Sequence, residues 1–335
     1  MVSNSNQLEL PLAISRLNGE FPRWVTTRDR KLLETSPKDI NADVVVAQDG
    51  SGNYGTVNEA VSSVPDNDNT RYIIYVKQGT YNENVVIGSN KKNVMLVGDG
   101  MDLTIITGNL NVIDGSTTFN SATVAAVGDG FIAQDICIQN TAGAVKEQAV
   151  ALLRVGADQS LINRCRIDAY QDTLYAHSNR QFYRDSCITG TIDFIFGNAV
   201  VMLQNCDIVV RLPMSGQFNA VTAQGKNNPN QNTGTSIQTC NVTASLDLEP
   251  IKGTIKSYLG RPWKAYSTTI FMQSYIEDHI DPAGWAEWGG DLNLNTLYYG
   301  EYMNYGSGAG IAMRVTWLGY HIITDPAEAS KFTVA

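Results

Sequence analysis

Two aspartates occupy unusual positions in this sequence, because each stands among apolar residues. Asp172 lies in Gln171-Asp-Thr-Leu-Tyr175, and Asp193 lies further along the chain in Gly190-Thr-Ile-Asp-Phe-Ile-Phe-Gly197. A carboxylate is costly to bury unless it is paired or used. The pair therefore suggests acid, base or nucleophilic chemistry. The alternative is two interior aspartates that cap turns.

A cysteine repeat indicates how these two residues could meet. Each cysteine has Asp, Asn or Gln two residues before it and Ile or Val one or two residues after it; the five are Cys137, Cys165, Cys187, Cys206 and Cys240. A position that recurs about every 20 residues, with longer gaps where loops intervene, is typical of a solenoid. With β-rich repeats, the natural solenoid is a parallel β-helix.

Equivalent residues on successive coils of a β-helix stack about 4.8 Å apart. The interval from Asp172 to Asp193 matches one coil of this repeat, and so does the interval from Gln148 to Gln171. We therefore expect all four side chains on one surface strip across three adjacent coils. Two carboxylates at that separation are strongly coupled and share one proton.

The rest of the chain agrees with a β-rich fold. Short runs of β-branched residues between turn residues predict strands at 44–47, 72–76, 84–87 and 93–97. No long segment has helical periodicity, although 148–155 could be a helical turn or a buried strand. The apolar fraction of 43% and charged fraction of 17% are those of a folded protein.

Charge and hydropathy exclude several classes of partner. The net charge of −9 argues against nucleic acid and against an anionic membrane surface. No run approaches the roughly 18 apolar residues of a membrane span. The first residues also lack the apolar core of a signal peptide, so we expect any secretion signal to be missing from these residues.

The motifs together resemble the signature blocks of plant pectin methylesterases. The main blocks are Gln171–Tyr175, Gly190–Asn198 and Leu259-Gly-Arg-Pro-Trp263, and further matching blocks lie at 116–123, 139–143, 148–152, 282–285 and 297–300. The similarity extends from about Val44 to the last residue. It implies an all-β fold, a single-stranded right-handed parallel β-helix of the pectin lyase-like type with long loops that form a cleft. It also implies hydrolysis of the methyl esters of cell-wall pectin to pectate and methanol.

The resemblance assigns a role to each residue of the strip. Asp193 is the expected nucleophile, and Asp172 is the proton donor that later acts as a base. Gln148 and Gln171 stabilise the oxyanion, and Arg261 orients Asp193 and keeps it ionised. The reaction itself requires the same residue types, because ester hydrolysis needs a nucleophile, a proton donor for the alcohol and hydrogen-bond donors aimed at the oxyanion. No Gly-x-Ser-x-Gly elbow occurs that would supply a serine nucleophile.

Other residues are expected to contact the substrate. The resemblance assigns Thr118, Arg261 and Trp263 to substrate binding. Aromatic side chains near the catalytic blocks could stack on sugar rings, and core packing is the alternative for each of them; they are Tyr175, Phe196, Tyr258, Trp263 and Trp285. His177 is predicted to be structural. His279 and His321 have no partner pattern, and we expect neither a metal nor a cofactor.

Residues 1–41 differ from the rest of the chain and are expected to be the remainder of an inhibitory pro-region, with residues 42–335 as the catalytic domain. Arg30-Lys-Leu-Leu33 resembles the processing site that ends the pro-region, and an exposed helix end is the alternative. The family pattern pairs Cys137 with Cys165 and Cys206 with Cys240, and it leaves Cys187 as a free thiol. Asn241 begins a glycosylation sequon, Asn-Val-Thr.

Two other functions remain alternatives to a secreted cell-wall esterase. A pectin glycoside hydrolase would also use paired carboxylates on a β-helix. A non-catalytic pectin-binding protein would need no intact site. For the esterase, the expected partners are pectin and a proteinaceous inhibitor of the enzyme, and the expected state is a monomer.

Overall fold

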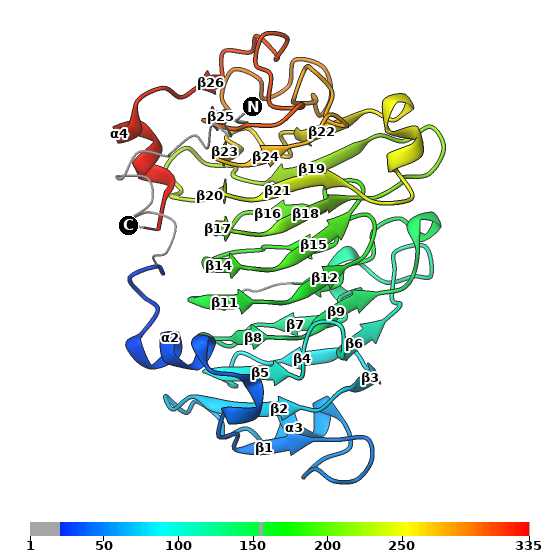
Figure 1. Cartoon of the computed structure of the whole chain (residues 1–335), viewed down its shortest axis with the longest axis vertical. Coiled ribbons are helices and arrows are strands. Elements are labelled where there is room, and N and C mark those ends of the chain that lie inside the picture. Colours follow the sequence, from blue (N-terminus) through cyan, green and yellow to red (C-terminus); the bar gives the residue numbers. More distant parts are fainter. Residues whose placement is uncertain (1–20, 154–156, 335) are drawn as a thin grey trace, which may run out of the picture.

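The computed structural model describes residues 21–153 and 157–334, and their strands form three long parallel sheets (Figure 1). From the second strand to the twenty-fourth the chain visits the three sheets in turn, so that successive coils add one strand to each sheet; the first strand and the last two belong to the largest sheet. All strand pairs are parallel, and each strand pairs with its counterparts one coil before and one coil after. The architecture is a parallel β-helix, as the spacing of the cysteines and aspartates predicted.

Sheet A runs the length of the molecule and contains β1 (Val44–Val46), β2 (Tyr72–Val76), β5 (Val94–Gly98), β8 (Ile132–Gln134), β11 (Ser160–Asn163), β14 (Arg180–Arg184), β17 (Val200–Gln204), β20 (Gly234–Gln238), β23 (Thr268–Met272), β25 (Tyr298–Tyr302) and β26 (Tyr320–Ile322). Sheet B contains β3 (Gly79–Asn82), β6 (Thr104–Gly108), β9 (Cys137–Asn140), β12 (Arg166–Asp168), β15 (Cys187–Gly190), β18 (Asp207–Val210), β21 (Asn241–Ala244) and β24 (Tyr275–Ile276). Sheet C contains β4 (Val85–Ile87), β7 (Val124–Ala126), β10 (Leu152–Leu153), β13 (Leu174–Tyr175), β16 (Ile195–Gly197), β19 (Asn219–Gln224) and β22 (Ser257–Gly260).

The four strands predicted from β-branched runs are all present as β1, β2, β4 and β5, with ends shifted by at most one residue. In the ambiguous segment 148–155, a strand forms only at Leu152–Leu153, and residues 154–156 lie outside the described residues. One apolar core runs through the stack, because alternate strand residues such as Ile138, Ile167, Ile188, Ile208 and Val242 point inward at the same position of successive coils.

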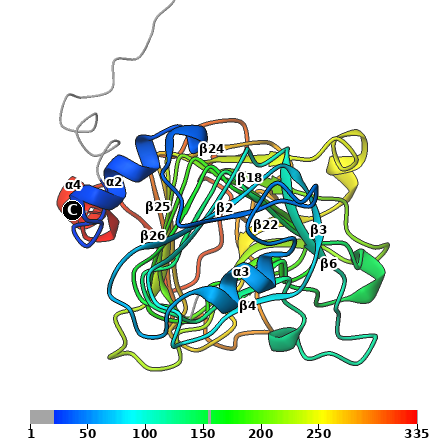
Figure 2. The same ribbon diagram turned by 90° about the horizontal axis from the view of Figure 1, so that it is seen from below.

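Helical segments are short and lie around the β-helix. They are α2 (Thr27–Glu34), α3 (Val57–Ser63), α4 (Pro326–Ala329), η1 (Pro37–Asp39), η2 (Thr118–Asn120), η3 (Ala144–Lys146), η4 (Glu249–Thr254) and η5 (Ser330–Phe332). A capping box between Thr56 and Glu59 starts α3. Figure 2 shows α3 across the end of the coil stack, where Val57, Ala60 and Val61 join the core. No helix in the described part of the chain is long and apolar enough to cross a bilayer.

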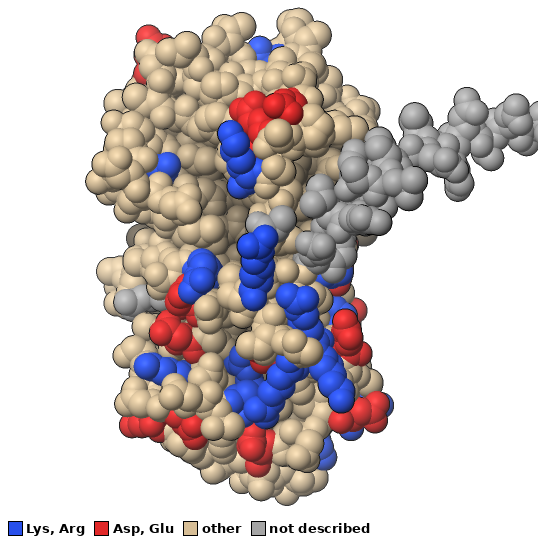
Figure 3. Space-filling model, turned by 90° about the vertical axis from the view of Figure 1, so that its left-hand side faces the viewer, with Lys and Arg blue, Asp and Glu red and all other residues tan. Residues whose placement is uncertain are grey.

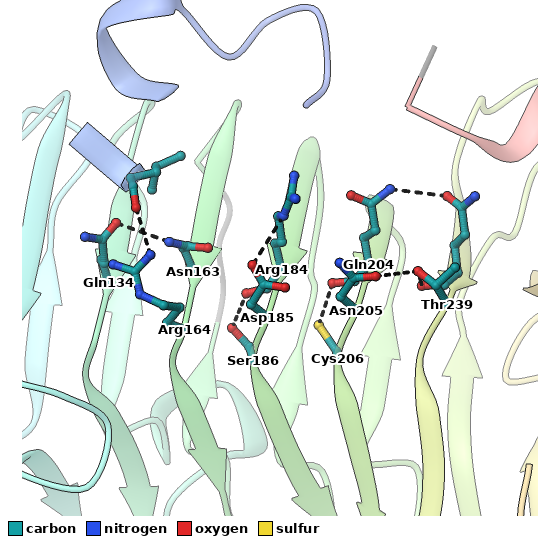
Figure 4. Close-up of polar contacts among 12 residues, drawn as sticks. Gln134, Asn163, Arg164, Arg184, Asp185, Ser186, Gln204, Asn205, Cys206 and Thr239 are labelled. Atoms are coloured by element: carbon teal, nitrogen blue, oxygen red, sulfur yellow. Dashed lines mark hydrogen bonds and ion pairs between the residues drawn. The ribbon is translucent and has the colours of Figure 1, made fainter. Parts of the chain in front are cut away.

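The turn between sheets A and B explains the cysteine repeat. Arg164, Asp185, Asn205 and Thr239 have left-handed backbone with φ between 48° and 54° at successive coils (Figure 4). Thr239 Oγ1 donates to Asn205 Oδ1 at 2.7 Å. The polar residue two positions before each cysteine is therefore either the left-handed residue of this turn or the residue directly before it.

The five cysteines do not share one position, contrary to the prediction. Cys165, Cys206 and Cys240 follow the left-handed residue directly and stack in the core, in register with Ser186 and Ser274. Cys137 and Cys187 come one residue later, level with Arg166 on sheet B. A shift of one residue along a strand reverses the face to which the side chain points. Spacing alone did not reveal this shift.

Neither predicted disulfide is formed in the structure, where all five cysteines are free thiols. Cys137 and Cys165 point to opposite faces of sheet B, which accounts for the lack of that bond. Cys206 and Cys240 are neighbours in the core ladder, but their Sγ atoms hydrogen-bond to the carbonyl oxygens of Gln204 and Gln238. Cys187 is a free thiol as predicted, and burial raises its pKa to about 11.

The segment around α2 packs on sheet A. Leu33 is 2% exposed and joins an apolar cluster with Met95, Phe182 and other outward residues of this sheet. Arg164 Nη1 donates to the carbonyl oxygen of Leu33 at 2.8 Å (Figure 4). The predicted processing residues Arg30, Lys31, Leu32 and Leu33 lie within α2, where Lys31 is exposed and Leu33 is buried against sheet A.

Candidate active site

Asp172 and Asp193 occupy equivalent positions on adjacent coils, as predicted. Each lies two residues before a sheet C strand, and the register pairs Leu174 with Ile195. Both have left-handed backbone, with φ of 63° and 51°. Asp adopts this conformation more readily than most residues. The two residues are 8% and 6% exposed, so both carboxyl groups are largely buried.

Arg261 forms a bidentate ion pair with Asp193. Its Nε and Nη2 atoms donate to Oδ1 and Oδ2 at 2.7 and 2.6 Å. Arg261 follows β22, two coils beyond Asp193. The close approach of β22 to β19 requires glycine at position 260, since a Cβ there would lie 2.0 Å from Thr222 Oγ1. This approach sets the backbone from which Arg261 reaches the carboxylate.

The surroundings of the two carboxyl groups differ. Burial raises the pKa of Asp172 well above its ordinary value, the charge of Asp193 raises it further, and the charge of Arg261 opposes both. Burial also raises the pKa of Asp193, but the hydrogen bonds and charge of Arg261 lower it. We expected Arg261 to make the pKa of Asp193 low; instead it offsets the effect of burial. The shared proton belongs on Asp172.

Of the two glutamines, Gln171 adjoins Asp172 on the same coil, and Gln148 lies one coil before it. A parallel β-bridge joins them, which confirms that the interval between them is one coil. Both side chains are half-buried, and neither amide is hydrogen-bonded within residues 21–153 and 157–334. Neutral amide donors of this kind suit a developing oxyanion because they add no charge to the site.

An aromatic wall lies beside the carboxyl pair on the outer face of sheet C. The rings of Tyr175 and Phe196 stack with centroids 4.2 Å apart, and Trp263 meets Phe196 edge-on at 6.0 Å. Phe119 packs in the same cluster, and it follows Thr118 on η2. The structure therefore brings three of the predicted substrate contacts together, Tyr175, Phe196 and Trp263, and Thr118 is the chain neighbour of Phe119 in the same cluster.

The prediction for Trp285 is wrong, because this residue belongs to the core. Its side chain is 1% exposed, stacks on Tyr299 at 4.2 Å, and donates through Nε1 to Glu301 at 3.2 Å. Tyr258 is half-buried, is not part of the cluster that forms the wall, and packs edge-on against Phe218 at 5.8 Å.

Two aromatic residues near Arg261 were missed by the sequence analysis. The guanidinium carbon of Arg261 lies 4.2 Å from the ring centroid of Trp288 and 5.2 Å from that of Phe218. Trp288 stands three residues after Trp285, inside no recognised block. Its proximity to the site depends on loop conformation, which the spacing of residues does not reveal.

A second missed feature is a polar cluster behind the carboxyl pair. Arg211 donates from Nη1 to Asp168 Oδ1 and to the carbonyl oxygen of Ala169, both at 2.9 Å, and from Nη2 to the hydroxyl of Tyr170 at 2.7 Å. The backbone N–H of Arg211 donates to the carbonyl oxygen of Gly190 at 2.8 Å. Arg211 therefore ties together the two strand ends from which Asp172 and Asp193 project. Its signal in the sequence is weak, because a lone arginine after a strand is common.

The three histidines and the glycosylation sequon are the remaining positions singled out in the sequence. His177 packs edge-on against Tyr175 at 5.2 Å, behind the aromatic wall. Burial lowers the pKa of His279 to about 4, so it is neutral near pH 7. His321 stacks on Tyr298, far along sheet A. Among the described residues, no group of three or more His, Cys, Asp or Glu is arranged to hold a metal. Asn241 is exposed on β21 and donates to Asp207 Oδ1.

Comparison with known proteins reveals one family. A family model described as Pectinesterase matches residues 43–335. The chain is 66% identical over 322 residues to a pectinesterase/pectinesterase inhibitor of Ficus pumila var. awkeotsang, covering 96% of this chain and 59% of that protein. It is 67% identical over 317 residues to pectinesterase 1 of Solanum lycopersicum, covering 95% of this chain and 58% of that protein. The chain thus spans about three fifths of the length of these curated relatives.

Solved structures agree. The pectin methylesterase from carrot has 58% identity and a TM-score of 0.86, covering 88% of this chain and 92% of that one. The pectin methylesterase from Aspergillus niger has 30% identity and a TM-score of 0.74, covering 84% of this chain and 90% of that one. The fold is the right-handed parallel β-helix of these proteins, as predicted.

Proposed function

The chain belongs to the pectinesterase family, and from this premise and the geometry of its site we propose that it hydrolyses the methyl esters of polygalacturonate, with pectate and methanol as products. The observation that carries the proposal is the asymmetry of the carboxyl pair. One buried carboxylate has a bidentate arginine, and its neighbour one coil away has none. Such asymmetry separates a nucleophile from a proton donor.

In the first step, an oxygen of Asp193 attacks the carbonyl carbon of the ester. The electron pair of the C=O bond moves to oxygen, where the amides of Gln148 and Gln171 donate hydrogen bonds. The bond to the methoxy group then breaks, and Asp172 gives its proton to the leaving methanol. A mixed anhydride joins the sugar to Asp193. Removal of one such oxyanion donor typically costs about 3–4 kcal/mol of transition-state stabilisation.

In the second step, the carboxylate of Asp172 takes a proton from water, whose oxygen attacks the anhydride. The sugar leaves as a carboxylic acid, Asp193 is again a carboxylate beside Arg261, and Asp172 is again protonated. Atoms and protons balance over the cycle, and no metal or cofactor takes part in it.

The aromatic wall supports a polymeric sugar as substrate. Tyr175 and Trp263 are half-buried and can stack on pyranose rings, while Phe196 is 7% exposed and supports the ring of Tyr175 by stacking on it; Thr118 is also half-buried. A related pectin methylesterase, 26% identical to this chain, has been solved in complex with a hexasaccharide. We assign substrate binding to Thr118, Gln148, Tyr175, Phe196, Arg261 and Trp263, and we leave Tyr258 as a peripheral candidate.

The biological setting follows from the same proposal. We propose that the protein is secreted to the plant cell wall, acts as a monomer, and is regulated by a proteinaceous pectinesterase inhibitor. Relatives from Ficus pumila var. awkeotsang and Arabidopsis thaliana are named pectinesterase/pectinesterase inhibitor. We also propose residues 1–41 as the remainder of a pro-region that is processed at 30–33, residues 42–335 as the catalytic domain, and Asn241 as a glycosylation site.

The main competitor is hydrolysis of the glycosidic bond, which also uses two carboxyl groups. The discriminating experiment measures products from highly esterified pectin. We expect methanol and new carboxylic acid groups in equal amounts, with no new reducing ends and no loss of viscosity. New reducing ends without methanol would reject the esterase in favour of the glycosidase, and the absence of both would favour a binding protein.

A further inference from the structure

A cavity of about 460 Å³ lies on the outer face of sheet A, away from the carboxyl pair. Its floor is formed by β14, β17 and β20, where Gln181, Val201 and Ser236 line it. One wall is the segment 22–24 near the start of the described chain, and the opposite wall is the segment 331–334 near its end. We call this space the sheet A cavity. Its volume is within the range of small-molecule sites, which is about 300–1,000 Å³.

Four cationic residues and no acidic residue line the sheet A cavity: Arg23, Arg180, Lys226 and Lys331. Arg180 is paired with Asp158. The other three have no ion-pair partner within residues 21–153 and 157–334. Figure 3 shows that Lys and Arg side chains gather mainly over the lower half of this face, and that an acidic cluster lies beside a basic side chain in its upper half. This concentration contrasts with the net charge of the chain, which is −9.

The remaining lining suits a sugar. Trp24 and Phe332 are both half-buried in the walls, and their rings can stack on pyranose faces. Asn232, Thr233 and Thr235 add amide and hydroxyl groups that can bond to sugar hydroxyls. Cations, aromatic rings and neutral polar groups in one cavity favour an acidic sugar over a simple inorganic anion.

The sheet A cavity is connected to the aromatic wall of the active site through Lys226. This residue follows Gly225, where a Cβ would lie 2.7 Å from Trp263 Cε3. The carbonyl oxygen of Lys226 accepts a hydrogen bond from the N–H of Tyr266 at 2.9 Å, and Lys264 Nζ lies 5.3 Å from the centroid of the Trp263 ring. Lys226 therefore belongs to the lining of the cavity and is also the next residue after Gly225, which packs against Trp263.

We propose that the sheet A cavity is a second carbohydrate site that binds unesterified galacturonate, the product of the proposed reaction. The proposal rests on the proposed function only for the identity of the sugar. Unesterified residues carry the carboxylate that Arg23, Lys226 and Lys331 would pair with, whereas methyl-esterified residues do not. Such a site would keep the protein on stretches of pectin that have already been de-esterified.

Calorimetric titration with a short unesterified oligogalacturonide at low ionic strength tests the proposal. The test variant is Arg23→Gln/Lys331→Gln, because both residues lie on the walls and neither contacts the carboxyl pair. The matched control is Lys38→Gln/Lys92→Gln, which removes the same charge near the opposite end of the β-helix. We expect two binding events for the wild type and the control, and loss of one event, or weakening by about tenfold or more, in the test variant.

Three outcomes would overturn the proposal. They are equal binding by the test variant and the control, equal binding of a fully methyl-esterified oligomer at this site, and equal binding of polyglutamate, which has carboxylates but no sugar rings. The titration with the methyl-esterified oligomer uses the Asp193→Ala background, so that every readout is binding without turnover. A protein that binds as expected but releases no methanol would refute the proposed function and leave the second site intact.

Discussion

At the scale of single residues, two aspartates at equivalent positions take different roles in the proposed reaction, nucleophile and proton donor. Asp172 and Asp193 share backbone conformation, burial and position in the coil. They differ in the bidentate contact of Arg261, which only Asp193 receives. Burial raises the pKa of both carboxyl groups. The pKa of Asp172 is raised more strongly, because the charge of Asp193 adds to burial and Arg261 forms no hydrogen bond with Asp172.

This arrangement predicts a bell-shaped dependence of kcat/KM on pH. Activity falls at low pH when Asp193 is protonated, and it falls at high pH when Asp172 loses its proton. In Arg261→Lys the pKa of Asp193 rises, because a point charge does not reproduce the planar fork. The acid limb should then move to higher pH, and the maximal rate should fall. An unmoved acid limb in rate profiles on pectin would contradict the role of Arg261.

Asp172→Asn should lose activity by about 10²–10⁴-fold, since the amide cannot donate and reclaim a proton. It should also be more stable than the wild type near pH 7. The folded pKa of Asp172 is raised above the unfolded value, so its contribution to stability is present below about pH 4 and is lost as pH rises toward the folded pKa. Thermal unfolding at pH 7 and pH 4 measures this, and a stability difference that does not change with pH would count against it.

At the scale of elements, the coil spacing was readable from the sequence because solenoid repeats keep equivalent residues at regular intervals. The interval between the two aspartates and the interval between the two glutamines predicted that Asp172, Asp193, Gln148 and Gln171 would share one strip. The register confirms both intervals as one coil. The face of each strand residue was harder to predict. A one-residue shift put Cys137 on the opposite face from Cys165, and no local pattern marks that shift.

The strand ends that carry the aspartates are held by Arg211. Arg211→Met should lower kcat by about tenfold to a hundredfold with KM nearly unchanged, because a displacement of about 1 Å at the reacting groups is costly. Arg211→Lys should recover part of the loss. Steady-state kinetics with a thermal-stability control separate this positioning role from simple destabilisation, which would leave the kcat of the folded fraction at the wild-type value.

Trp263 belongs to the aromatic wall of the site, whereas Trp285 belongs to the apolar core of the β-helix. Trp285→Ala should destabilise the protein by about 3–5 kcal/mol, since it removes a fully buried aromatic ring stacked on Tyr299. Its KM for pectin should stay at the wild-type value. Trp263→Ala should instead raise KM with little change in unfolding free energy. Denaturant titration and kinetics on both variants check this, and a raised KM for Trp285→Ala would restore it to the cleft.

At the scale of the whole molecule, one continuous core fixes the strip that carries the site. Helix α3 covers one end of the stack (Figure 2). Segments near the two ends of the described chain, which are far apart in the sequence, pack close to each other on sheet A (Figures 1 and 2). The sequence predicted the β-helix, since repeats are local. It did not predict the docking of α2 or the sheet A cavity, because contacts between distant segments leave no periodic signal.

The central claim is that Asp193 is the nucleophile in methyl ester hydrolysis. The most direct test is methanol release from esterified pectin by the wild type and by Asp193→Ala, with circular dichroism as a check of the fold. We predict that the variant keeps its fold and loses activity by about 10⁴-fold or more. Methanol release within tenfold of the wild-type rate by a folded Asp193→Ala variant would contradict the account.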